Sequence, residues 1–155
     1  MAESQQKQAW ITSLRLLAAT PKTRRELAAK LSDKGYAEAV IRETLDALES
    51  QGLLSDQAYA RNLLGRFTLS QPSGKRKIAF ELKRHGVPTG IRNELLEGLT
   101  PEDETGRARE IAGARWERLK TLPAEKRKKR IYDLLIRRGF DFQIARDILE
   151  ELEST

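Results

Sequence analysis

The sequence predicts an all-α fold: an elongated tandem array of three three-helix repeats with about nine helices. Three observations predict it. Apolar residues recur at three- and four-residue spacing along the whole chain, with no sustained alternation of apolar and polar residues. Glycine, proline and capping residues interrupt the chain at intervals typical of helix ends. One helix–glycine turn–helix pattern also occurs three times.

The first repeat is predicted over residues 1–54. An apolar stripe over residues 6–19 predicts its first helix. Thr23 and Glu26 form the spacing of a capping box, which opens the second helix. Gly35 ends that helix, and a third helix follows until Gly52.

The second and third repeats are predicted over residues 55–100 and 101–155. Residues 56–70 form the first helix of the second repeat, and Gln71-Pro72-Ser73-Gly74 is a breaker and the candidate linker. Thr100 followed by Pro101 is an N-cap with proline at the first helical position. It opens a long helix over about 101–120.

The internal repeat is most evident around three glycines, Gly35, Gly86 and Gly139. They lie 51 and 53 residues apart, and an apolar residue stands 8 positions before each of them. The full pattern is Leu27, Leu31, Gly35, Ile41, Leu45; then Ile78, Leu82, Gly86, Ile91, Leu95; then Ile131, Leu135, Gly139, Ile144, Ile148. Two helices cannot bury their apolar stripes alone, so each pair needs the helix that precedes it.

Composition excludes several classes of function. The 155 residues contain no Cys and a single His, His85, which excludes a disulfide framework and disfavours a metal site or a Ser-His-Asp triad. No cofactor or metal is therefore expected. No apolar run approaches the roughly 20 residues of a membrane span, and no secretory signal is visible, so we expect a cytoplasmic protein.

Basic residues gather in clusters, and the net charge is +6 with a pI near 9.7. Such clusters favour a polyanion or an acidic protein surface as partner. Arg24, Lys75 and Lys128 lie in first helical turns, where a cation opposes the helix dipole, so a contact is the better explanation for them. The candidate contact residues are Arg24, Arg25, Lys75, Arg76, Lys77, Lys83, Arg84, Lys126, Arg127, Lys128, Lys129, Arg130, Arg137 and Arg138.

Several segments resemble the RecX family. The run from Gly52 to Arg61, Gly-Leu-Leu-Ser-Asp-Gln-Ala-Tyr-Ala-Arg, is similar to the signature of that family. Thr23-Arg24-Arg25-Glu26-Leu27 resembles its first unit, Glu81-Leu82 with Gly86-Val87 its second, and Arg137-Arg138-Gly139-Phe140 its third. The resemblance covers roughly residues 12–150, in order.

The resemblance implies a negative regulator of the RecA recombinase. Such a protein binds the RecA–single-stranded DNA filament and inhibits its extension, ATPase, strand exchange and coprotease activities. The implied partners are the RecA filament and single-stranded DNA, contacted directly or through the filament. We expect a monomer that is not an enzyme.

Two other classes of function remain to be weighed. A stand-alone helix-turn-helix type of nucleic-acid-binding protein would use the same helix pairs, but the acidic third helices, with Glu38, Glu43 and Asp46 in the first repeat, disfavour major-groove readout. An enzyme has no motif support, because Gly86-Val87-Pro88-Thr89-Gly90 lacks the Lys-Ser/Thr of a phosphate-binding loop.

Overall fold

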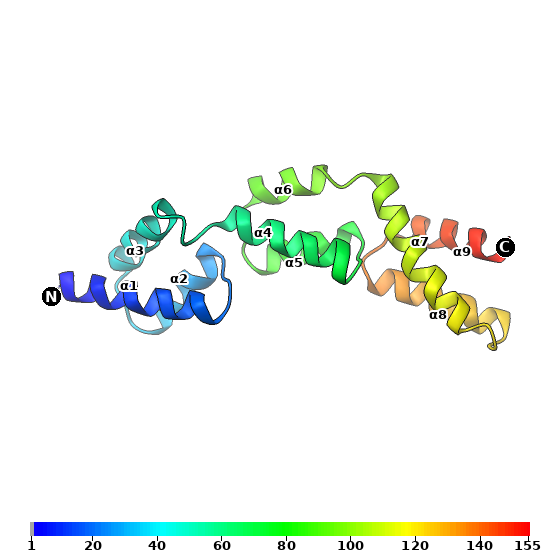
Figure 1. The fold of residues 1–155 in the computed structure, drawn as a ribbon, viewed down its shortest axis with the longest axis horizontal. Helices are drawn as coiled ribbons and strands as arrows, with labels where there is room; N and C mark the ends of the chain where they lie inside the picture. The colour runs from blue at the N-terminus through cyan, green and yellow to red at the C-terminus, as the bar shows by residue number, and fades with distance from the viewer. Residues whose placement is uncertain (1) are drawn as a thin grey trace. The chain divides into compact units, whose positions relative to one another are not determined.

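The computed structural model describes residues 2–155, which form nine α-helices and no β-strand (Figure 1). The helices are α1 (Ala2–Ala19), α2 (Arg24–Asp33), α3 (Glu38–Ser50), α4 (Asp56–Gly65), α5 (Lys75–Arg84), α6 (Thr89–Glu97), α7 (Pro101–Arg118), α8 (Ala124–Arg137) and α9 (Phe142–Glu153). A π-helical turn, Arg66–Ser70, follows α4 directly. The all-α prediction is confirmed for the described part of the chain. None of these helices is long and apolar enough to cross a membrane.

Local capping signals set several of the helix starts. The Thr23 hydroxyl accepts a hydrogen bond from the Glu26 main-chain N–H, and the Glu26 carboxylate accepts from the Thr23 N–H at 3.1 Å. This is the predicted capping box. Thr100 caps α7 by accepting from the Asp103 N–H at 3.1 Å, and Pro101 occupies the first turn. These predicted caps are therefore confirmed.

One compact unit contains the chain up to Asn62 together with Leu82–Arg92. Its core lies where α1, α2 and α3 pack together, and Trp10 packs against it from α1. Burying a leucine side chain stabilises a fold by about 1.5–3 kcal/mol, so the three apolar stripes stabilise one another only when packed. The buried members are Leu27, Leu31, Ile41, Leu45, Leu48 and Leu54.

The other compact unit contains Leu63–Glu81 and Asn93–Thr155. Its core forms between α7, α8 and α9, with Trp116 of α7 packed against it. Trp116 is thus a packing residue, as Trp10 is in the first unit. The buried members are Ala108, Ala112, Ile131, Leu135, Phe140, Ala145 and Ile148. Residues of the predicted second repeat fall in both units, so the boundaries 1–54, 55–100 and 101–155 stay a prediction.

The segment 71–74 is not the free linker that its Pro-Ser-Gly composition suggests. Ser73 and Gly74 are buried. The Ser73 carbonyl accepts a hydrogen bond of 2.9 Å from Nε of Arg107, a buried arginine of α7. Burial lowers the pKa of the Arg107 guanidinium, and the nearby Glu104 and Asp103 carboxylates partly offset this effect. The segment is therefore a fixed part of the second unit.

The repeated glycines end their helices as predicted. Gly35, Gly86 and Gly139 have φ of 91°, 83° and 89°, in the left-handed region that favours glycine. At each of them the next residue donates a main-chain bond back across the turn; Phe140, for example, donates to the Leu135 carbonyl at 3.0 Å. This is the pattern of a Schellman stop.

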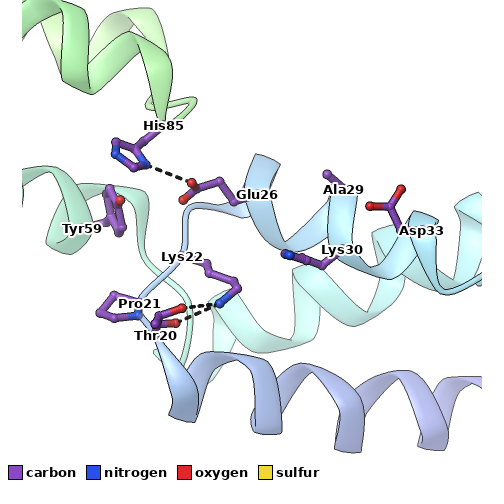
Figure 2. A pocket seen from close by; sticks show the side chains of 9 residues that line it. All are labelled: Thr20, Pro21, Lys22, Glu26, Ala29, Lys30, Asp33, Tyr59 and His85. Atoms are coloured by element: carbon purple, nitrogen blue, oxygen red, sulfur yellow. Dashed lines mark hydrogen bonds and ion pairs between the residues drawn. The ribbon is translucent and has the colours of Figure 1, made fainter.

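In the first unit the end of α5 contacts the start of α2. The buried Thr23 hydroxyl donates to the His85 carbonyl at 2.6 Å, and His85 Nδ1 lies 2.9 Å from a Glu26 carboxylate oxygen (Figure 2). Two helix ends of opposite dipole sign meet here, which is favourable. Burial raises the pKa of the Glu26 carboxyl, but hydrogen bonds from His85 and Thr23 outweigh burial, and the pKa lies below its ordinary 4.5.

The second unit contains an equivalent contact made entirely by main-chain atoms. The Gly74 N–H donates to the Arg138 carbonyl at 2.8 Å, and the Arg76 N–H donates to the Gly139 carbonyl at 3.2 Å. The first turn of α5 therefore satisfies carbonyls at the end of α8, two groups that helix ends ordinarily leave without partners. A Cβ atom at Gly139 would collide with the Lys77 main chain and Cβ. Glycine is therefore required there both by the positive φ and by the lack of space for a side chain.

Replacing Gly139 with Val is expected to destabilise the second unit. Left-handed strain costs about 1–2 kcal/mol or more, and the collision with Lys77 adds to it. Thermal melting is the measurement, and limited trypsin digestion should cut the basic helix at 124–139 before it cuts the first unit. Gly35→Val is the matched control, because Gly35 has φ of 91° but open space around a Cβ. Equal losses from the two substitutions would contradict the close packing at Gly139.

Glu26→Gln is expected to lower stability at pH 7 and to lose its effect in acid. Because the folded pKa is lowered, the carboxylate stabilises the fold above pH 4.5, and this contribution disappears as pH falls through the folded pKa. A loss of about 1 kcal/mol corresponds to roughly 2–4 °C in melting temperature. Glu38→Gln, also in a first helical turn but exposed, is the control. Identical melting of both variants at pH 7 would show that the His85 and Thr23 bonds contribute nothing.

Candidate functional site

The predicted contact residues lie mainly on α2, α5 and α8. The structure separates those whose charge is used within the chain from those that present it to solvent. The exposed set is Arg25, Lys75, Arg76, Lys83, Arg84, Lys126, Lys129, Arg130 and Arg137, and the half-buried set is Arg24, Lys77, Arg127, Lys128 and Arg138. Exposed cations are the better candidates for binding a partner, because solvent and a partner can reach them. Arg84 is in this set although it also interacts within the chain.

Arg24 uses its charge within the first unit. Its guanidinium forms an ion pair with Asp46 at 2.9 Å and another with Glu49. The hydrogen bond with Glu49 is the main cause that raises the pKa of Arg24. Arg24 also donates its main-chain N–H to Asp56 at 2.8 Å. These contacts give a structural reason for a cation in the first turn of α2, where the helix dipole alone disfavours it.

A pocket of about 530 Å³ opens beside this part of the first unit (Figure 2). Basic and acidic side chains both line it, and Tyr59 and His85 form one side, with ring centroids 5.7 Å apart. Lys22 Nζ donates to carbonyls at the end of α1, those of Leu16 and Thr20, at 3.2 and 3.3 Å. The ionisable groups there are largely engaged in holding helix ends, so the pocket has no strong excess of either charge.

Two of the cations in α8 also have structural partners. The Arg127 guanidinium donates to the Trp116 carbonyl at 2.6 and 3.0 Å and lies 3.6 Å from the centroid of the indole ring. Lys128 forms ion pairs with Glu153 at 2.6 Å and Glu125 at 3.5 Å. Arg127 therefore ties α8 to α7, and Lys128 ties α8 to α9. Arg138, just after α8, donates to the Pro72 carbonyl at 3.2 Å.

The remaining cations of α8 form an exposed surface, which we call the α8 basic face: Lys126, Lys129, Arg130 and Arg137. Within the described residues none of the four has an ion pair. Lys126, Arg130 and Arg137 follow at spacings of four and seven, which places them on one side of the helix. Asp133 is the acidic residue among them. The α8 basic face is one of the exposed positive surfaces that the basic clusters in the sequence predicted.

Two apolar side chains lie near these cations and were not among the residues predicted from the basic clusters in the sequence. Phe80 of α5 is 63% exposed and Ile136 of α8 is 37% exposed, and both line a groove of about 510 Å³ with Arg76, Lys77 and Arg137. A signal was present in the sequence: Phe80 stands four residues after Arg76 and off the stripe of Ile78 and Leu82. The sequence could not show which residues of α8 lie in the same groove as Phe80, because that depends on the tertiary contact at Gly139.

No cluster of three or more His, Asp or Glu side chains in the described part of the chain is arranged to hold a metal ion. The geometry around the exposed cations is instead that of a binding surface. Guanidinium and ammonium groups there can pair with phosphate or carboxylate oxygens.

Comparisons with known proteins assign the family. Residues 9–48 match the model of the first three-helix domain of RecX, and residues 102–149 match that of its third three-helix domain. A regulatory protein RecX of Chlorobium limicola is 34% identical over 155 residues, which covers 100% of this chain and 96% of the relative. One from Mycobacterium sp. strain KMS is 35% identical over 150 residues and covers 94% and 82%.

Two solved structures share the fold. The crystal structure of RecX from Lactobacillus salivarius matches with a TM-score of 0.84 at 21% identity, and the match covers 99% of each chain. A second crystal structure, of a regulatory protein RecX, matches with a TM-score of 0.77 at 23% identity and covers 96% of this chain and 73% of that one. The relatives bear the name of a regulatory protein rather than of an enzyme. Together with the near full-length identity to curated relatives, these matches show that the chain belongs to the RecX family.

Proposed function

We propose that this protein is a negative regulator of the RecA recombinase that binds the RecA–single-stranded DNA filament. In this proposal it blocks filament extension and so inhibits the ATPase, strand-exchange and coprotease activities of RecA. The observation that carries the proposal is the match to RecX proteins along the whole chain. We further propose that it acts in the cytoplasm, as a monomer and without a cofactor.

The exposed charge supports a polyanionic partner for the protein. The α8 basic face presents four cations that form no ion pair within the described residues, with one acidic residue, Asp133, among them. Binding of such a surface to phosphates releases counterions, so it weakens steeply as salt rises. The half-buried arginines and lysines of the basic clusters in the sequence make contacts within the fold instead. We therefore propose only the exposed cations as contact residues.

A stand-alone nucleic-acid-binding protein is the second candidate, favoured by the same exposed cations. Co-sedimentation with RecA filaments and with naked single-stranded DNA at matched salt separates the two. A filament regulator binds the filament more tightly than the DNA alone. A protein that binds both equally, or DNA better, fits the second candidate.

The protein is expected to suppress the DNA-dependent ATPase of RecA at less than one molecule per RecA. A regulator that caps a filament, or lies along it, need not occupy every protomer to stop growth. The measurement is ATP hydrolysis on single-stranded DNA titrated with the protein, using RecA from the same organism. An unchanged rate at a several-fold molar excess of folded protein would overturn the proposal.

Charge reversal on the α8 basic face is expected to weaken filament binding by more than about tenfold. The variant carries Glu at Lys126, Lys129 and Arg130, and it spares Arg127 and Lys128 because these hold α8 in place. The control reverses three exposed arginines elsewhere, Arg42, Arg61 and Arg66, and so makes the same change in net charge. Circular dichroism checks the helix content of both. Equal loss in the two variants would mean that net charge alone governs binding.

A further inference from the structure

The groove between α5 and α8 in the second unit is formed by two helices whose backbones are hydrogen-bonded to each other. Its wall on α5 carries Arg76, Lys77 and Phe80, and its wall on α8 carries Ile136 and Arg137. The main-chain bonds from Gly74 to Arg138 and from Arg76 to Gly139 lock the two walls together. The close approach at Gly139 leaves no room for a side chain between them. The backbones of the two walls are therefore held together before any ligand arrives.

The groove combines a flat apolar surface with positive charge. Phe80 is the most exposed of the aromatic side chains in the described residues, at 63%, and Ile136 stands beside it in the same groove. Arg76 and Arg137 are exposed and have no ion pair within the described part of the chain. Lys77 Nζ lies 5.8 Å from the Phe67 ring centroid, and the lining carboxylate, Glu81, already interacts within the chain. A ligand that fits must offer both an anion and an apolar face.

We propose that this groove binds a nucleotide of single-stranded DNA, with a base stacked on Phe80 and the flanking phosphates paired with Arg76 and Arg137. The inference rests on the proposed function and names the part of the filament that this surface contacts. Every base presents a π-face to an aromatic side chain, and arginine pairs readily with phosphate. In duplex DNA the bases are already stacked on one another, so an exposed phenylalanine cannot reach a π-face without opening the helix.

The α8 basic face offers further cations to a DNA strand bound in the groove. Arg137 belongs both to the groove and to that face, and Arg130 and Lys126 lie about two and three helical turns before it, toward the start of α8. The rise along α8 from Arg137 to Lys126 is about 16 Å. A phosphate backbone that leaves the groove at Arg137 can therefore remain in contact with cations along this length of helix.

Fluorescence anisotropy with the full chain and labelled oligothymidylate tests the groove. Phe80→Ala is expected to weaken binding roughly tenfold, the effect of losing one stacked base, while Phe80→Tyr keeps the stacking and the affinity. An oligomer of the same length with abasic sites offers phosphates without bases. Its affinity is expected to be the same for the parent and for Phe80→Ala.

Phe142→Ala is the matched control, since Phe142 is also an exposed aromatic, at 53%, with the Arg146 guanidinium 5.2 Å from its ring. It is expected to bind oligothymidylate like the parent. The groove proposal is overturned if Phe80→Ala binds oligothymidylate as the parent does, or if it loses as much affinity for the abasic oligomer. It is also overturned if the parent does not bind oligothymidylate at all. The RecA ATPase titration with the parent chain decides the proposed function separately, so the two can fail independently.

Discussion

The fold depends on satisfying the main-chain groups at the ends of its central helices. A helix stopped by a glycine exposes carbonyls that need donors, and a helix that begins exposes N–H groups that need acceptors. In the first unit the Thr23 hydroxyl at the start of α2 donates to the His85 carbonyl at the end of α5. In the second, the start of α5 donates to the carbonyls of Arg138 and Gly139. The same kind of contact between two helix ends thus occurs within each unit.

The same contacts explain why several basic residues are not available to a partner. A first turn rich in Lys and Arg is unfavourable next to a helix N-terminus unless each cation finds an anion or a carbonyl. In the first turn of α2, Arg24 pairs with Asp46 and Glu49. Because α8 begins at Ala124, Lys128 lies beyond its first turn, contrary to the sequence prediction, and it pairs with Glu153. Arg138, just after α8, donates to the Pro72 carbonyl. Arg127 lies over the Trp116 ring. The exposed positive surface is consequently smaller than the basic clusters in the sequence, and the α8 basic face is one part of it.

The helices, caps and glycine stops were predictable because each is encoded within a few neighbouring residues. Thr23 with Glu26, and Thr100 with Pro101, determine helix starts by local hydrogen bonds and fixed φ angles. What could not be predicted depends on residues distant in sequence. The burial of Ser73 by Arg107 turned a predicted linker into a fixed segment, and Ile136 came to line the same groove as Phe80 through the contact at Gly139. Periodicity shows which face of a helix is polar, but not which other helix that face will meet.

Because Gly74, Arg76, Arg138 and Gly139 meet through main-chain atoms, that junction restricts few side chains. It requires glycine at the two points of closest approach, Gly74 and Gly139. An architecture joined in this way can drift far in sequence while its backbone stays in register. A solved RecX structure that shares only 21% of its residues with this chain still superimposes with a TM-score of 0.84. The main-chain contacts of this junction do not use the exposed side chains that the proposed partner would meet.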